Sequence, residues 1–402
     1  MSTAADRYVD AYRAEKPAGD PWLTERREAA IARFAELGFP TLRTEAWKYT
    51  NVAPLTRTAF TPARPAQVTR EAVAPFLIDG CRHVVLTNGR LAPELSNFAV
   101  APLSWAERDL IGDNIGSFAA LNTALMPDAA VLRLADGAMV QVLHVAAPGG
   151  TELFNPRVIV IADVNASATL VESYVGSGVY WTNAVTTILA GQGAQLTHVK
   201  LQDEALQGFH TGACRVEIAR DAHYRSLVLS SGARLARNEI SAALIGEGAQ
   251  CNLDGIALVA AGQHADATTL LDHRVPHGAS RECYKSVVDD DGRSVFQGSI
   301  LVGHDAQKTD ARQMHRALLL SPQAHADAKP ELRIFADDVK CAHGATVGDL
   351  DAESLFYLRS RGVDLETARG LLIEAFVTEL FEPIAAPAIR AALDARLHRW
   401  LT

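Results

Sequence analysis

A repeat of about 27 residues runs through the middle of the sequence, from residue 157 to residue 335. In each unit, two runs of alternating β-branched and polar residues flank a turn that contains Gly, Asp or Asn and is followed by Ala. Successive turn alanines are 26, 28, 27, 30 and 27 residues apart, at Ala168, Ala194, Ala222, Ala249, Ala279 and Ala306. A seventh, shorter unit places Ala326 at its turn. Any fold for this chain must explain a nearly constant period.

A single strand–turn–strand unit cannot bury both of its faces, whereas units stacked in register can. A coil with short strands in every rung, each rung ~4.8 Å above the last, meets this requirement. Antiparallel sandwiches also use short strands, but they give no reason for a near-constant rung length. The repeat therefore predicts a mainly β fold built on a parallel β-helix.

Helical patterns flank the repeat on both sides. Residues 21–38 form an amphipathic pattern that Gly38 closes as a C-terminal cap. After Gly348, Asp351 and Asp364 are expected to cap two helices at their N-termini. We therefore divide the chain into an N-terminal helical region (1–75), a β-helix core (76–348) and a C-terminal helical region (349–402).

The last predicted helix, residues 388–400, has one apolar face. Its apolar residues recur every three or four positions, at Ile389, Leu393, Leu397 and Trp400. This face has two interpretations. It packs on the core of its own chain, or it belongs to a helical appendage that binds a partner.

Charge and hydropathy exclude several classes of function. The net charge of −9 gives no basic surface for nucleic acid. No apolar run approaches the ~18 residues that a membrane span needs. The N-terminal residues carry Asp6, Arg7 and Asp10 without the apolar stretch of a secretory signal. Five scattered cysteines argue against a disulfide framework, so we expect a cytoplasmic protein with reduced thiols.

Cys341 and His343 stand at the junction between the repeat and the C-terminal helices. The segment around them is predicted to be a strand, on which residues i and i+2 face the same side. A Cys-x-His pair supplies at most two of the four ligands of a closed metal site. His315 lies 28 residues before His343. The two imidazoles could therefore stack one rung apart, although any two residues separated by one period would do so.

The common catalytic signatures are absent from the sequence. It contains no phosphate-binding loop, no His-Glu-x-x-His, no Gly-x-Ser-x-Gly and no Cys-x-x-Cys. A β-helix enzyme that acts on polysaccharides is the alternative from another functional class. Such an enzyme needs a carboxylate pair in a groove, and no convincing array is visible. We therefore expect a protein that is not an enzyme.

Three separated blocks of sequence resemble one family. They are residues 40–50 (PTLRTEAWKYT), residues 329–348 (KPEL followed by ADDVKCAHGATVG) and residues 355–362 (LFYLRSRG). In these blocks the chain resembles the SufB/SufD family of iron–sulfur cluster assembly proteins, and specifically its SufD branch. The resemblance covers nearly the whole chain.

The resemblance implies a right-handed parallel β-helix between helical ends and a non-catalytic scaffold role in a SufBCD complex. It implies pairing with SufB and binding of the SufC ATPase through the C-terminal helical region. It further implies a transient iron–sulfur cluster or iron shared with SufB, and reduced flavin as an electron source in the complex. A homodimer is expected when the chain is isolated, because an exposed sheet edge favours lateral pairing.

The resemblance places the family's important SufD histidine on His343. His343 would face a cysteine of SufB across the subunit boundary and help to hold iron or the nascent cluster. Cys341 shares its face, and we interpret it as a packing residue or as support for the ligand. SufB members carry an essential cysteine about one rung upstream of their histidine motif. This chain has no cysteine between Cys283 and Cys341, which favours the SufD branch.

Overall fold

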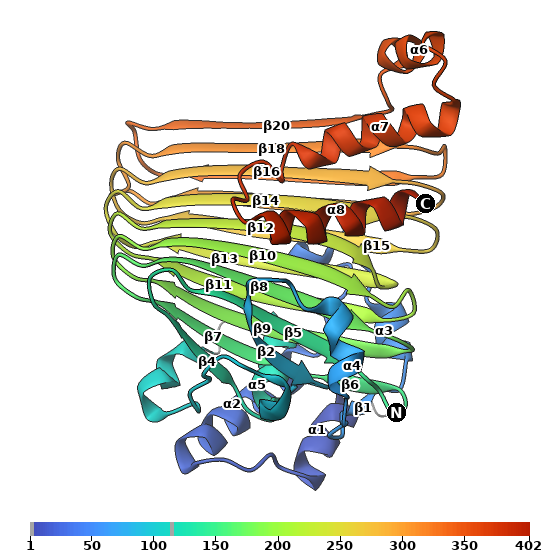
Figure 1. Ribbon diagram of the computed structural model, residues 1–402. Helices are drawn as coiled ribbons and strands as arrows, with labels where there is room; N and C mark the ends of the chain where they lie inside the picture. The colour runs from blue at the N-terminus through green and yellow to red at the C-terminus, as the bar shows by residue number, and fades with distance from the viewer. Residues whose placement is uncertain (1–3, 113–115) are drawn as a thin grey trace.

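The computed structural model describes residues 4–112 and 116–402. The middle of the chain winds as a parallel β-solenoid of about 8 turns, and each turn adds one strand to each of two sheets (Figure 1). Sheet A comprises β1 (Thr61–Pro62), β4 (Ala130–Leu134), β6 (Glu152–Phe154), β7 (Arg157–Ala162), β9 (Tyr180–Ala190), β11 (Phe209–Ile218), β13 (Leu235–Leu244), β15 (His264–His273), β17 (Arg293–Val302) and β19 (His325–Ile334). Sheet B comprises β2 (Arg82–Thr87), β3 (Arg90–Leu91), β5 (Met139–Ala146), β8 (Ser167–Gly176), β10 (Gln195–Glu204), β12 (His223–Gly232), β14 (Gln250–Val259), β16 (Ala279–Val288), β18 (Asp310–Leu319) and β20 (Lys340–Gly348). The predicted parallel β-helix with helical ends is confirmed.

The register of sheet B gives the true length of each rung. Paired residues at the start of its strands are 28, 28, 27, 29, 31 and 30 residues apart, from Ser167 through Gln195, His223, Gln250, Ala279 and Asp310 to Lys340. The rungs therefore lengthen toward the C-terminus, where the predicted period of 27 no longer holds.

Some predicted turn alanines are misplaced. Ala194, Ala222, Ala249 and Ala306 occupy equivalent turns, since each donates its backbone N–H three residues back along the chain. In the first unit Ala166, not Ala168, takes this place. Ala168, Ala279 and Ala326 instead lie inside strands β8, β16 and β19. The reason is that alanine fits both a tight turn and a close-packed strand, so its spacing alone does not separate the two.

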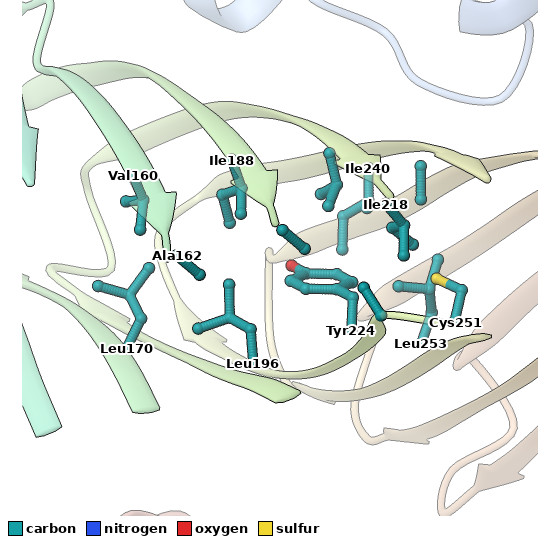
Figure 2. Close-up of a cluster of buried hydrophobic side chains, with 14 of the residues drawn as sticks. Val160, Ala162, Leu170, Ile188, Leu196, Ile218, Tyr224, Ile240, Cys251 and Leu253 are labelled. Carbon is teal, nitrogen blue, oxygen red and sulfur yellow. The ribbon is translucent and has the colours of Figure 1, made fainter. Parts of the chain in front are cut away.

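Inward-facing side chains of the two sheets meet in the solenoid interior. Figure 2 shows part of this core, in which residues paired by the register stack in columns from rung to rung. One such column on sheet A is Ile188, Val216, Ala242, Leu271 and Ile300. Burying a large apolar side chain in this way contributes on the order of 1.5–3 kcal/mol to the free energy of unfolding. Each such side chain contacts the rungs above and below it, so it stabilises both interfaces.

The N-terminal helices cover the outer faces of both sheets near the start of the solenoid. They are α1 (Asp6–Ala14), α2 (Pro21–Leu37), α3 (Ala53–Arg57), α4 (Arg70–Val73) and α5 (Gly116–Leu125), with the short helices η1 (Glu45–Trp47), η2 (Ala74–Phe76), η3 (Pro93–Leu95) and η4 (Trp105–Leu110). Tyr8, Phe34 and Trp47 join Trp181 of β9 in one aromatic cluster. Gly38 ends α2 with a φ of 61°, as predicted. The stretch from 92 to 129 carries η3, η4 and α5, of which η3 contacts β2 and α5 contacts α2.

The C-terminal region forms α6 (Ala352–Ser360), α7 (Leu365–Thr378) and α8 (Pro387–Leu401). Asp351 and Asp364 cap α6 and α7, as predicted. In α8, Ile389, Leu393 and Leu397 are fully buried against the outer face of sheet B, so this apolar face packs on its own chain. α6 has no buried residue and projects from the end of the solenoid (Figure 1). No helix in the described parts of the chain is long and apolar enough to span a membrane.

Candidate functional site at the open end of the solenoid

Cys341 and His343 lie in β20, the last strand of sheet B. Cys341 pairs with Ala311 and His343 pairs with Gln313 in the strand below, and both of these partners are buried in the interior. The two residues therefore share the inward face, as the strand prediction requires. Because no rung follows, Cys341 stays half-buried against the core while His343 is exposed.

His315 does not stack directly below His343. Its partner in β20 is Ala345, because the rung between β18 and β20 is 30 residues long rather than 28. The His315 imidazole stacks on the Phe296 ring at 5.0 Å, and its Nε2 lies 3.3 Å from Ser286 Oγ. Burial lowers the pKa of His315 to about 4, so the imidazole is neutral at physiological pH. His315 is a packed interior residue whose column meets β20 at Ala345, two residues from His343.

Two buried polar side chains stand beneath His343. Gln313 donates from Nε2 to Glu282 Oε2 at 2.6 Å, and Glu282 lies one rung further down the same column. Burial raises the pKa of Glu282 to about 7, although hydrogen bonds from Thr269 and Gln313 oppose this shift. A column of three polar groups thus runs from the interior to the exposed imidazole.

The backbone of β20 is unpaired on its outer side. Lys340 donates its N–H to the carbonyl of Thr309, the residue just before β18, at 2.8 Å. Alternate residues of a strand engage the same neighbour, so the N–H and C=O groups of Cys341, His343 and Ala345 point away from β18. The site therefore combines an exposed imidazole with a free strand edge.

The described residues do not group a complete set of metal ligands. Within residues 4–112 and 116–402, no three His, Cys, Asp or Glu side chains are grouped so that they could hold an ion. Burial raises the pKa of the Cys341 thiol, which reduces the thiolate fraction that a metal would bind. This weakens Cys341 as a candidate ligand, and the ligand role of His343 stays a prediction.

A buried ionic cluster that the sequence patterns did not indicate lies in the first half of the interior. Glu172 Oε2 lies 2.9 Å from His198 Nε2, and Glu172 Oε1 lies 3.6 Å from His144 Nε2. Burial alone would raise the pKa of Glu172, but hydrogen bonds from the two histidines hold it well below its usual range. Tyr174 also donates to Glu172 at 3.1 Å.

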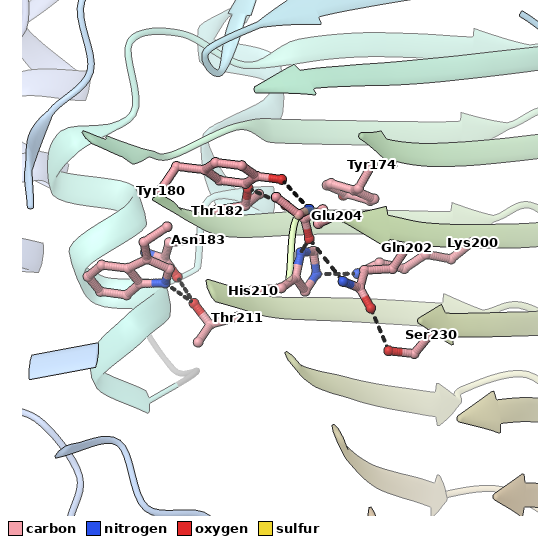
Figure 3. Close-up of polar contacts among 12 residues, drawn as sticks. Tyr174, Tyr180, Thr182, Asn183, Lys200, Gln202, Glu204, His210, Thr211 and Ser230 are labelled. Carbon is pink, nitrogen blue, oxygen red and sulfur yellow. Dashed lines mark hydrogen bonds and ion pairs between the residues drawn. The ribbon is translucent and has the colours of Figure 1, made fainter. Parts of the chain in front are cut away.

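A second group, drawn in Figure 3, contacts this cluster through Tyr174, whose ring centre lies 4.9 Å from that of His210. Lys200 Nζ lies 2.9 Å from His210 Nε2, and His210 Nδ1 lies 2.6 Å from Glu204 Oε2. The ammonium can only donate, so His210 accepts at Nε2 and carries its proton on the side of Glu204. Burial and the neighbouring Lys200 lower the pKa of His210. The group is an internally compensated ion pair bridged by a neutral imidazole.

Two of the sequence blocks that carry the family resemblance meet in space. Lys329 forms an ion pair with Glu45 of the N-terminal block. In the same block Trp47 lies under the Arg237 guanidinium, 3.9 Å from the ring centre. Residues 40–50 are therefore a packing element that joins the N-terminal region to sheet A.

Comparison with known proteins assigns the family. The family model described as "SUF system FeS cluster assembly, SufBD core domain" matches residues 144–376, and that of the SufBD N-terminal region matches residues 3–66. The iron–sulfur cluster assembly protein SufD of Escherichia coli is 31% identical, over 92% of this chain and 91% of that protein. The chain belongs to the SufB/SufD family.

Other members of the family agree with this assignment. An iron–sulfur cluster assembly SufBD family protein of Synechocystis is 31% identical, over 93% of this chain and 90% of that protein. The chloroplastic protein ABCI7 of Arabidopsis thaliana is 38% identical, over 59% of this chain and 50% of that protein. Membership of the SufB/SufD family supports a SufD-like role in iron–sulfur cluster assembly.

Proposed function

We propose that this chain is a non-catalytic, SufD-like scaffold subunit that pairs with SufB and binds the SufC ATPase in a SufBCD complex. The observation that carries the proposal is the position of His343. Its imidazole is exposed at the open end of the solenoid, on a strand whose outer edge is free. An incomplete ligand set on an unpaired edge is what a site shared between two subunits requires.

In this proposal His343 contributes a nitrogen ligand to iron or to a nascent cluster, and SufB contributes thiolate. Imidazole and thiolate are both suitable ligands of iron. The metal is cargo that the complex builds and releases, so a resident, closed site on one chain is not needed. Cys341 packs beside His343 and shields the interior.

SufC is assigned to the exposed α6 and the adjoining part of α7. Phe356 and Tyr357 of α6 are 74% and 57% exposed, which is unusual for aromatic side chains on a helix. The apolar face of α8 is already covered by sheet B, so it is not available to SufC.

Without SufB, the free edge of β20 would pair with a second copy of the chain and give a resting homodimer. Electron supply, for which the resemblance implies reduced flavin, is assigned to the assembled complex rather than to this chain. The cysteines of the described residues are all free thiols, which fits a reducing cytoplasm. The interior carboxylates Glu172, Glu204 and Glu282 are sealed from a polymer, so they do not favour the polysaccharide-active alternative.

The test is co-expression of His343→Ala with SufB and SufC. The variant should form the complex normally, because His343 is exposed and supports no packing. Loss of a ligand should cut the cluster yield in cells by roughly tenfold or more. Yield is measured from the absorption spectrum of the purified complex and from the activity of an iron–sulfur reporter enzyme.

His325→Ala is the matched control, because His325 is exposed at the start of the other edge strand, β19. It should assemble clusters as the wild type does. Normal cluster yield in His343→Ala would refute the proposed role of His343, as would an equal loss in both variants.

A further inference from the structure

Gln313 is only 2% exposed although it lies one rung from the open end of the solenoid. Its Nε2 is engaged by Glu282, but its Oε1 is buried without a hydrogen-bond partner among the described residues. A buried acceptor without a partner is costly, and such groups are rare in folded proteins. The free oxygen therefore calls for an explanation.

The orientation of the amide is set from below. Above its raised pKa of about 7, Glu282 is an ionised carboxylate that only accepts hydrogen bonds, so at pH 8 it requires the NH₂ side of the Gln313 amide. Across the interior, Gly298 makes room for that group, since a Cβ there would lie 2.1 Å from Gln313 Nε2. The Phe296 ring closes the same side, 2.7 Å from that Cβ position. Nε2 is therefore committed to Glu282, and Oε1 is the atom of the amide that can accept a hydrogen bond from another residue.

The next inward side chain in this column is His343, the partner of Gln313 in the register of β18 and β20. We propose that Gln313, held by Glu282, is a positioning residue that accepts a hydrogen bond from the His343 imidazole. The inference rests on the proposed function for its purpose, whereas the register pair and the unpartnered oxygen from which it is argued belong to this chain alone. It assigns Glu282 and Gln313 a place in the cluster-assembly site.

The hydrogen bond decides which nitrogen of His343 is free. The ring nitrogen that faces Gln313 must carry the proton, because Oε1 can only accept. The other nitrogen is then unprotonated and directed away from the interior, where it can ligate iron. Support of a metal-binding histidine by a hydrogen bond to its second nitrogen is a general way to fix its tautomer and raise its basicity.

The tautomer can be measured directly on the full-length chain without any metal. The chain is labelled with ¹⁵N-histidine and studied at pH 8, where Glu282 is largely ionised. The ring ¹⁵N shifts of His343, assigned by their loss in His343→Gln, should report one dominant tautomer in the wild type. Gln313→Leu should convert this signal to a mixture of the two tautomers.

Two further variants keep the test decisive. Glu282→Gln retains volume but allows the Gln313 amide to turn over, so it should also give a mixture. His315→Leu changes an inward side chain of the same strand two residues from Gln313, and it should leave the His343 tautomer unchanged. If Gln313→Leu does not fold, Glu282→Gln and His315→Leu still give the comparison.

A mixture of tautomers in the wild type would overturn the inference, and so would a single tautomer that survives both Gln313→Leu and Glu282→Gln. The cellular assay separates this result from the proposed function. Gln313→Leu should lower the cluster yield roughly tenfold, by analogy with lost support of a metal ligand. If His343→Ala reduces the yield but Gln313→Leu changes neither tautomer nor yield, the scaffold function stands and the positioning role fails.

Discussion

Glu282 is a carboxyl group enclosed by the solenoid two rungs below the open end. Burial raises its pKa from 4.5 to about 7, and the nearby Asp254 acts in the same direction. Because the folded-state pKa lies above the unfolded one, folding favours the protonated form. This stabilisation is fully present below pH ~4.5 and is lost as the pH rises through about 7.

Glu282→Gln should remove this pH dependence. Relative to the variant, the free energy of unfolding of the wild type should fall by about 3 kcal/mol between pH 4.5 and pH 8. Urea denaturation at several pH values measures the difference. The exposed Glu94→Gln is the control and should follow the wild-type profile. Parallel curves for the wild type and Glu282→Gln would contradict the prediction.

The residues of the candidate site differ in how far the sequence could predict them. The shared face of Cys341 and His343 follows from the two-residue period of a strand, and the register bears it out. Glu282 and Gln313 were missed because polar residues at alternating positions normally face water. In addition, Gln313 follows Glu282 by 31 residues and His343 follows Gln313 by 30. Both steps depart from the 27-residue period that the turns suggested.

At the scale of elements, α8 buries its apolar face against the solenoid, whereas α6 exposes two aromatic side chains. The sequence could not decide whether the apolar face of α8 meets its own chain, because the pattern is the same for either partner. The structure decides it, since Leu393 is fully buried against sheet B. In α6, Phe356 and Tyr357 face solvent. Lys285 anchors the neighbouring α7 by donating to the Phe376 carbonyl at 2.6 Å.

Phe356→Asp should weaken binding to SufC without destabilising the chain, because Phe356 is 74% exposed. If Phe356 anchors the interface, the loss should be at least tenfold in Kd, in the range of interface hot spots. Titration calorimetry with purified SufC measures Kd, and the melting temperature reports stability. Leu206→Asp, on an exposed solenoid turn, should change neither quantity. Unchanged SufC affinity in Phe356→Asp would remove α6 from the proposed interface.

For the whole molecule, the two edge strands at the open end differ. His325 of β19 donates its N–H to Gly292, so the backbone N–H and C=O groups of the even-numbered residues of β19 point away from β17. One of these residues is Pro330. Proline has no N–H to offer a new strand, which makes β19 a poor edge for pairing. β20 contains no proline and keeps its outward backbone groups available.

Ala345→Pro should therefore leave the fold intact and weaken association through β20, both in the homodimer and with SufB. Its N–H points away from β18, so the substitution removes a donor that only a partner would use. Ala342→Pro is the contrasting variant, because its N–H engages β18 and its loss should lower the melting temperature. Light scattering gives the oligomeric state. A stable dimer in Ala345→Pro would place the contact elsewhere.

Because each rung contacts only the rungs above and below it, the number of rungs fixes the distance between the two ends of the solenoid. About 8 turns at ~4.8 Å each separate the helices that cover its first rungs from the imidazole at its last. Deleting one whole rung would shorten this span by a fixed step and leave the remaining contacts intact. Rung number, more than the identity of any surface residue, would then set how far the iron-binding end stands from the N-terminal helices.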